Sequence, residues 1–141
     1  MFRTILVPVD LAELDVSKKA IEVATSLAQQ SGGALRFVTV LQFLPATYLD
    51  YIPANYDEKQ KAWAQEELEK ITAKIDLPKE RVSYAIRTGG IYPEILAEAE
   101  QWGADLIVIG SHRPAMSTYL LGSNAKTVVR HAKCSVLVAR E

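Results

Sequence analysis

The sequence is poor in cysteine, with Cys134 as the single thiol among 141 residues. One thiol cannot form an internal disulfide, and no cluster of cysteine and histidine has the spacing of a metal site. We therefore expect a fold held by its hydrophobic core, in a reducing compartment such as the cytoplasm. With 49% hydrophobic residues, a single domain spanning residues 1–141 can bury such a core, and Cys134 is expected to pack inertly at the start of a strand.

Long apolar runs are also missing, since no stretch approaches the roughly 20 residues that cross a bilayer as a helix. The first residues lead into a strand-like segment without the pattern of a secretory leader. The charges nearly cancel, with 16 Lys plus Arg against 17 Asp plus Glu and a net charge of -1. No basic run stands out, so we expect no nucleic acid and no membrane among the partners, and a cytoplasmic location.

Signatures of several enzyme classes are absent as well. No strand is followed by Gly-x-x-x-x-Gly-Lys-Ser/Thr, so the chain is not a P-loop ATPase. No Ser/His/Asp arrangement and no pair of carboxylates with acid–base spacing stands out. Catalysis is therefore the less favoured interpretation.

Short strands alternate with amphipathic helices along the whole chain. The strands are expected at 4–10, 35–41, 81–87, 105–110 and 134–140. A first helix, capped by Asp15 or Ser17, should end at Gly32-Gly33, and a second should span about 57–75 with Ala62, Leu68, Ile71 and Ile75 on its inner stripe. A third helix begins near Pro93 and ends at Gly103, and a fourth spans 123–131.

This alternation predicts an α/β fold with an open five-stranded parallel sheet and helices on both faces, similar to the Rossmann fold. Right-handed crossovers and coverage of both faces require one reversal of winding, which gives the strand order 3-2-1-4-5. Ligands in such sheets bind at the carboxyl ends of the strands beside the reversal. Asp10 closes the first strand and Gly110 closes the fourth, so both are expected at the site.

The segment from Gly110 to Asn124 leaves a buried strand and enters a helix, with Gly122 and Ser123 at the helix start. Unpaired backbone N–H groups and the positive end of the helix dipole make such a point an anion site. Ser123 could donate its hydroxyl to a phosphate, or hold Mg²⁺ beside one. By spacing alone, a plain turn at Gly122 with a helix cap at Ser123 explains these residues equally well.

The sequence resembles the universal stress protein family, the UspA superfamily, and most of all its small F-type branch. The resemblance covers essentially the whole chain, and the matching stretches are 5–10, 105–112, 120–123 and 128–138. ATP-binding members carry a Gly, two residues, a second Gly, nine residues and then Gly-Ser or Gly-Thr. Their nucleotide lies across the switch point of a 3-2-1-4-5 sheet. The resemblance therefore implies an ATP-binding stress-response or signalling module with slow or no hydrolysis.

Each matching position acquires a role from this resemblance. Pro8, Val9 and Asp10 would contact adenine and ribose, with the Asp10 carboxylate accepting from ribose hydroxyls. Val40 would meet the adenine through its backbone. The remaining ATP-binding positions would be Ile109, Gly110, His112, Arg113, Gly122, Ser123 and Asn124, of which the two glycines, Ser123 and Asn124 would hold the phosphates.

One position departs from the family motif, because Arg113 stands where the second glycine is expected and only eight residues separate it from Gly122. The change removes a close backbone approach and adds a charged fork that suits phosphate. We expect nucleotide binding to survive, with Arg113 reaching the phosphates. The alternatives are a nucleotide-free dimerising scaffold of the same fold and a weak ATPase. Residues 10–13 read Asp-Leu-Ala-Glu, unlike the Ser-Gly-Gly-x-Asp-Ser loop of ATP pyrophosphatases, which argues against adenylating chemistry.

Two segments are expected to make contacts outside the sheet. The apolar connection 43–56 would be a flap beside the nucleotide, a subunit contact or a cover for the core. The last strand, Ser135–Ala139, would be an apolar edge, which invites pairing with another chain. Family members dimerise through this strand, so the resemblance implies a homodimer, or a tetramer formed by two such dimers.

Overall fold

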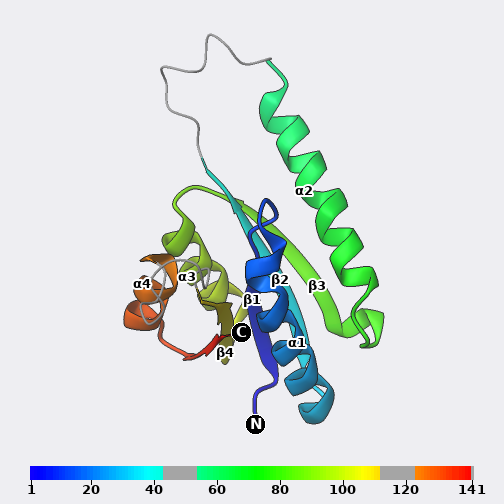
Figure 1. The fold of residues 1–141 in the computed structure, drawn as a ribbon, viewed down its shortest axis with the longest axis vertical. Coiled ribbons are helices and arrows are strands. Elements are labelled where there is room, and N and C mark those ends of the chain that lie inside the picture. The colour runs from blue at the N-terminus through cyan, green and yellow to red at the C-terminus, as the bar shows by residue number, and fades with distance from the viewer. Residues whose placement is uncertain (43–53, 112–122, 141) are drawn as a thin grey trace.

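The computed structural model describes residues 1–42, 54–111 and 123–140, and these form a three-layer α/β fold (Figure 1). The described strands build one parallel sheet in the order β3-β2-β1-β4-β5, which confirms the predicted fold class and strand order. The strands are β1 (Thr4–Pro8), β2 (Ala34–Leu41), β3 (Val82–Thr88), β4 (Leu106–Gly110) and β5 (Ser135–Ala139).

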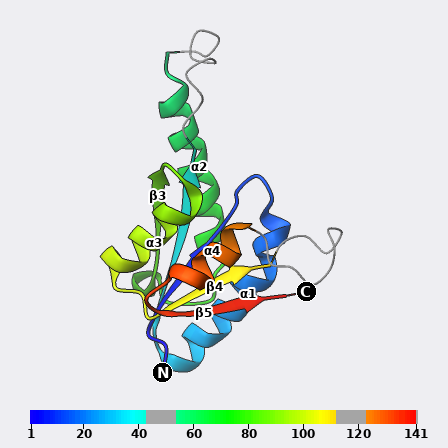
Figure 2. The same cartoon turned by 90° about the vertical axis from the view of Figure 1, so that its left-hand side faces the viewer.

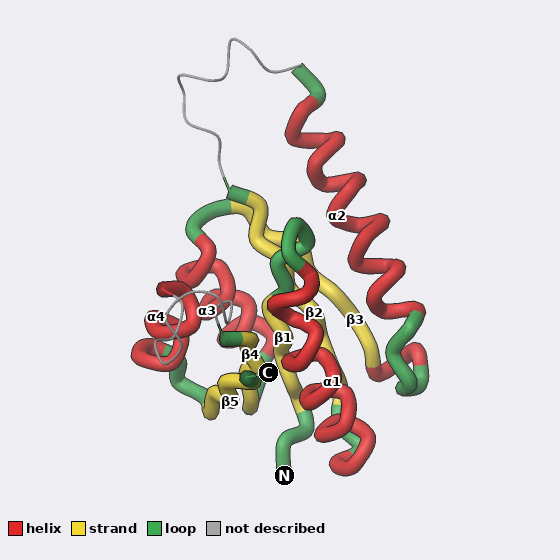
Figure 3. The backbone as a smooth tube through the Cα atoms, viewed as in Figure 1, coloured by secondary structure: helices red, strands yellow, loops and turns green. Residues whose placement is uncertain are grey.

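Helices cover both faces of this sheet (Figures 1, 2 and 3). On one face lie α1 (Leu14–Ser31) and α2 (Tyr56–Ala73), and on the other lie α3 (Ile91–Trp102) and α4 (Ser123–His131). A short 3-10 turn, η2 (Lys79–Arg81), precedes β3. No helix in the described part of the chain is both long and apolar enough to span a bilayer.

Strand β1 is buried on both faces, which explains why it carries apolar side chains on both. Ile5 and Val7 pack beneath α1 and α2, whereas Leu6 points to the opposite layer and packs beneath α3 and α4. All three side chains are fully buried. Neighbouring residues of a strand face opposite sides, so a strand covered on both faces must be apolar throughout.

Several predicted helix boundaries hold and others shift. Gly32 and Gly103 end α1 and α3 with φ values of 72° and 80°, in the left-handed region that glycine adopts without strain. The predicted caps of α1 are wrong, because the helix begins at Leu14 with Glu13 in the cap position, so Asp15 and Ser17 lie inside its first turn.

The inner face of α2 also differs from the prediction. Ala62 is exposed, and Ala64 is buried together with Leu68. These two residues are four apart, which places them one above the other on a helix, whereas Ala62 and Leu68 are six apart. Figure 1 shows that the start of α2 extends beyond the sheet. Fewer apolar side chains are therefore needed along that half of the helix.

Candidate functional site

A cavity of about 320 Å³ opens at the carboxyl ends of the strands, where β1 and β4 lie side by side. This is the switch point at which the sheet reverses its winding. Every described member of the predicted site lines the cavity, namely Pro8, Val9, Asp10, Val40, Ile109, Gly110, Ser123 and Asn124. The other predicted members, His112, Arg113 and Gly122, lie outside the described residues, as does most of the expected flap.

Strand β2 continues past the end of β1 and borders the cavity. The last residue of β2 with a register partner in β1 is Val38, whose carbonyl accepts the Val9 N–H at 2.9 Å. In a parallel ladder the N–H and C=O of one residue point to the same side, and the side alternates along the strand. The N–H and C=O of Val40 therefore point to the side that β1 has left. On that side they have no hydrogen-bond partner among the described residues.

Asp10 is fixed in a tight turn just after β1. The Ala12 N–H donates to its Oδ1 at 3.0 Å, and the Glu13 N–H donates to its backbone carbonyl at 3.1 Å. The residue is exposed and lines the cavity. This turn holds an acceptor at the mouth of the cavity, where a hydroxyl of a bound molecule can donate to it.

Gly110 ends β4 beneath the start of α1. A Cβ atom at this position would collide with the backbone carbonyl oxygen of Val16. From the sequence, this glycine is expected to let the backbone come close to a phosphate. The structure adds a second reason for a glycine here, which is the close packing of α1 against β4. Gly110 therefore supports the shape of the cavity whether or not a ligand touches it.

The first turn of α4 forms the wall next to β4. Ser123 is exposed and Asn124 is half-buried, and both line the cavity. The Ser123 carbonyl accepts a hydrogen bond from the Thr127 hydroxyl at 2.8 Å, one turn further along α4. Arg130 and His131 lie in the last turn of α4, where positive charge suits the helix dipole.

Sequence reasoning missed several other residues of the cavity wall. They include Glu13 just before α1, Val16 and Ser17 in α1, Val38 and Thr39 in β2, Gln42 just after it, Ile91 and Ile95 in α3, Ser111 just after β4, and Ala125 in α4. The parallel topology brings the N-termini of α1, α3 and α4 to the same edge of the sheet. That signal is available in the sequence, because each of these helices follows a strand that ends at the site.

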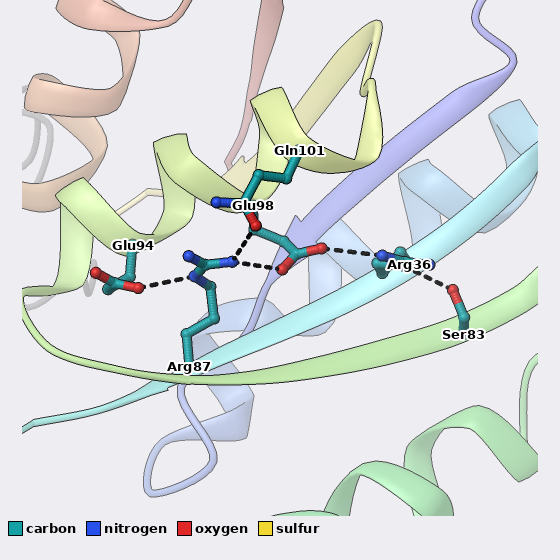
Figure 4. A network of polar contacts seen from close by, with 6 residues as sticks. All are labelled: Arg36, Ser83, Arg87, Glu94, Glu98 and Gln101. Atoms are coloured by element: carbon teal, nitrogen blue, oxygen red, sulfur yellow. Dashed lines mark hydrogen bonds and ion pairs between the residues drawn. The ribbon is translucent and has the colours of Figure 1, made fainter.

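An ion-pair network holds α3 against β2 and β3 (Figure 4). Glu98 is only 6% exposed, and its carboxylate accepts from Arg36 Nη1 at 2.9 Å and from Arg87 Nη1 at 3.0 Å. Arg87 Nε also donates to Glu94 Oε1 at 2.8 Å, and this hydrogen bond raises the pKa of Arg87. The guanidinium of Arg36 lies 4.7 Å from the ring centroid of Trp102. The network fixes the helix whose Ile91 and Ile95 line the cavity.

Cys134 lies away from this site, just before β5. It is half-buried, and burial raises the pKa of its thiol. A thiol that resists ionisation is a poor nucleophile, in keeping with the packing role expected for it. No group of three or more potential metal-binding side chains occurs in the residues that the structure covers.

Comparisons with known proteins identify the family. The model of the universal stress protein family matches residues 1–140. Universal stress protein G of Escherichia coli O157:H7 is 37% identical over 143 residues, covering 99% of this chain and all of the relative. Because that relative is a G-type protein, placement in the F-type branch stays a prediction.

Solved structures agree with this assignment. Universal stress protein UspA from Lactobacillus plantarum is 25% identical, with a TM-score of 0.80 over 99% of this chain and 98% of that one. A family member from Arabidopsis thaliana with AMP bound is 19% identical, with a TM-score of 0.69 over 99% of this chain and 92% of that one, and shares the fold. Family model, relative and fold agree over nearly the full length, and the chain belongs to the universal stress protein family.

Proposed function

We propose that this protein binds ATP in the cavity between β1 and β4 and acts as a nucleotide-dependent stress-response or signalling module. The observation that carries the proposal is the convergence on one cavity of every described residue that the family motif assigns to ATP. Its volume of about 320 Å³ lies in the range of small-ligand sites. The AMP bound to the Arabidopsis thaliana neighbour supports an adenine nucleotide as the ligand class.

The adenine would lie at the β2 end of the cavity. The N–H and C=O of Val40 form an adjacent donor and acceptor, which match the N1 acceptor and N6 donor of adenine. Ile91 and Ile95 supply apolar surface on the α3 side of the same cavity. Asp10 would accept hydrogen bonds from the ribose hydroxyls, because its carboxylate is held at the cavity mouth by the turn to Ala12.

The phosphates would lie toward Gly110 and the first turn of α4. Ser123 and Asn124 stand at the N-terminus of that helix, where free N–H groups and the helix dipole favour an anion. Arg113 and Gly122 would contribute from the connecting segment, and His112 would add a polar contact. Ser123 is also placed to hold Mg²⁺ together with phosphate oxygens, which are the ligands this ion prefers.

ATP would act mainly as a bound signal, with slow hydrolysis or none. To test this, the small molecules carried by freshly purified protein are released and identified, and bound ATP is followed for hours with and without Mg²⁺. Persistent ATP supports the proposal, whereas rapid formation of ADP or AMP would show an enzyme. An empty protein that also ignores added ATP would show the alternative, a nucleotide-free scaffold of the same fold.

The outer edge of β5 would pair with a second copy to form a homodimer, and two dimers could form a tetramer. The Ser111 N–H donates to the Ala139 carbonyl at 3.0 Å, so Ala139 faces β4. By alternation, Val136 and Val138 turn their N–H and C=O groups outward. No strand of the described residues pairs with this edge, which supports pairing with another chain. Light scattering that gives the mass of a monomer at micromolar concentration would contradict the homodimer.

A further inference from the structure

Ser17, in the first turn of α1, has an unpaired hydroxyl on the wall of the cavity. The residue is only 5% exposed and lines the cavity, and its hydroxyl has no hydrogen-bond partner among the described residues. Yet no fully buried side-chain oxygen or nitrogen in the described ranges lacks a partner. The Ser17 oxygen must therefore reach accessible space, and the space beside this residue is the cavity.

Two hydroxyls near Ser17 do have partners, one on the same cavity wall and one in the same helix. Thr39, 4% exposed and also on the wall, donates to the Val9 carbonyl at 3.0 Å. Thr25, in the same helix as Ser17, donates to the Ile21 carbonyl one turn earlier at 2.7 Å. That bond to the preceding turn is the usual partner of a helical hydroxyl. The Ser17 hydroxyl makes no such bond, so it stays available to a bound molecule.

The position of Ser17 identifies the end of the cavity that it serves. Its Cα lies 3.8 Å from the point where a Cβ of Gly110 would stand, so it is next to the carboxyl end of β4. Ser111 and the first turn of α4 line this same end, whereas Val40 and Ile91 come from the elements at the opposite end. Ser17 is therefore a neighbour of the proposed phosphates and not of the base.

Groups that disfavour an anion and groups that favour one both lie at this end of the cavity. The carboxylates of Asp10 and Glu13 also line the cavity and disfavour an anion, which a divalent cation would offset. The N-terminal turns of α1 and α4 favour an anion, and a hydroxyl can donate directly to it. We propose that the Ser17 hydroxyl donates a hydrogen bond to a phosphate oxygen of the bound adenine nucleotide, an inference that rests on the proposed function.

The test compares adenosine, AMP and ATP by calorimetry, with Mg²⁺ present, on the full chain. Ser17→Ala should bind AMP and ATP about tenfold more weakly and adenosine as the wild type does, because only the phosphate contact is lost. Ser17→Thr keeps the hydroxyl and should restore most of the affinity. Ser26→Ala is the matched control, since Ser26 is an exposed serine of the same helix.

Each outcome decides the inference. Unchanged AMP and ATP affinity in Ser17→Ala overturns it, and an equal loss for adenosine overturns the assignment to phosphate. Thermal unfolding of the variant should match the wild type, because the substitution breaks no hydrogen bond within the described residues. If the wild type binds none of the three compounds, the proposed function fails and the inference fails with it. A wild type that binds and a variant that behaves identically overturn the inference alone.

Discussion

The carbonyl oxygen of Val16 occupies the space that a side chain at Gly110 would need. This contact joins the first turn of α1 to the last residue of β4, and both residues line the cavity. Any substitution at Gly110 must therefore move a helix backbone and not merely a flexible side chain. The glycine has a structural role that can be measured without a ligand.

Gly110→Ala should lower the free energy of unfolding by roughly 1–3 kcal/mol, because the added methyl group overpacks a rigid contact. Urea unfolding of the protein without added nucleotide measures the change. Gly90→Ala is the control, since a Cβ there meets only the Pro93 side chain, at 3.3 Å. Equal stability of Gly110→Ala and the wild type would show that the helix moves away without cost.

Val40→Pro should weaken the binding of adenine nucleotides by about tenfold or more, because it removes one backbone donor. The sheet should survive, since this N–H points away from β3 and proline is tolerated where a strand N–H has no partner. Val40→Ala keeps the N–H and serves as the control. Titration with ATP and a circular dichroism spectrum are the two measurements, and equal ATP affinity of Val40→Pro and Val40→Ala would contradict recognition through this backbone.

Glu98→Gln should destabilise the fold by roughly 1–3 kcal/mol, because two arginines would lose their shared carboxylate beneath α3. The side chains of Arg36 and Arg87 are 27% and 20% exposed, so water still reaches them. The loss of stability therefore stays below that for a fully buried, unpaired charge. Denaturant unfolding gives the value. Glu100→Gln breaks the exposed ion pair with Lys133 and should have no measurable effect. Similar curves for both variants would mean that the network contributes little.

Val136→Pro should shift the proposed homodimer toward monomer. It removes an outward N–H from the β5 edge and leaves the bonds to β4 intact, because Ser135, Leu137 and Ala139 face that strand. Sedimentation equilibrium across a range of concentrations measures the dissociation. Leu137→Pro removes an inward N–H and should lower stability instead. A Val136→Pro protein that remains dimeric would place the interface elsewhere.

The Cys134 thiol should make stability depend on alkaline pH. Burial raises the pKa of the folded thiol above that of the unfolded chain, so the folded state holds this proton more tightly. The contribution of the protonated thiol to the free energy of unfolding is complete below the pKa of the unfolded chain, about 8.5. It is lost as the pH rises through the pKa of the folded thiol. The melting temperature should therefore fall less between pH 7 and pH 10 in Cys134→Ala than in the wild type. The same slope in both proteins would contradict the effect.

The fold and the place of the site follow from the sequence because both depend on patterns that extend over many residues. Apolar runs such as 105–110 predict buried parallel strands, and the need to cover both faces sets the order of all strands. Asp10 and Gly110 then lie at the switch point by topology alone.

The finer features depend on contacts that no local pattern encodes. The sequence predicts Asp15 or Ser17 as the cap of α1, but the helix begins at Leu14, and Ser17 lies inside it as part of the cavity wall. Glu98 looks like one more charged residue on a helix surface, and its burial depends on arginines from two separate strands. Ala62 shows the same limit, because only the position of α2 beyond the sheet decides which alanine is covered.

Strand β2 runs on to Leu41 although its register with β1 stops at Val38. The overhang offers a donor and an acceptor that belong to the main chain, and every amino acid except proline carries the same pair. Evolution can therefore exchange the side chain at position 40 while the contact persists. In a set of homologues this part of the site would look unconstrained, and its signature would be the avoidance of a single residue type.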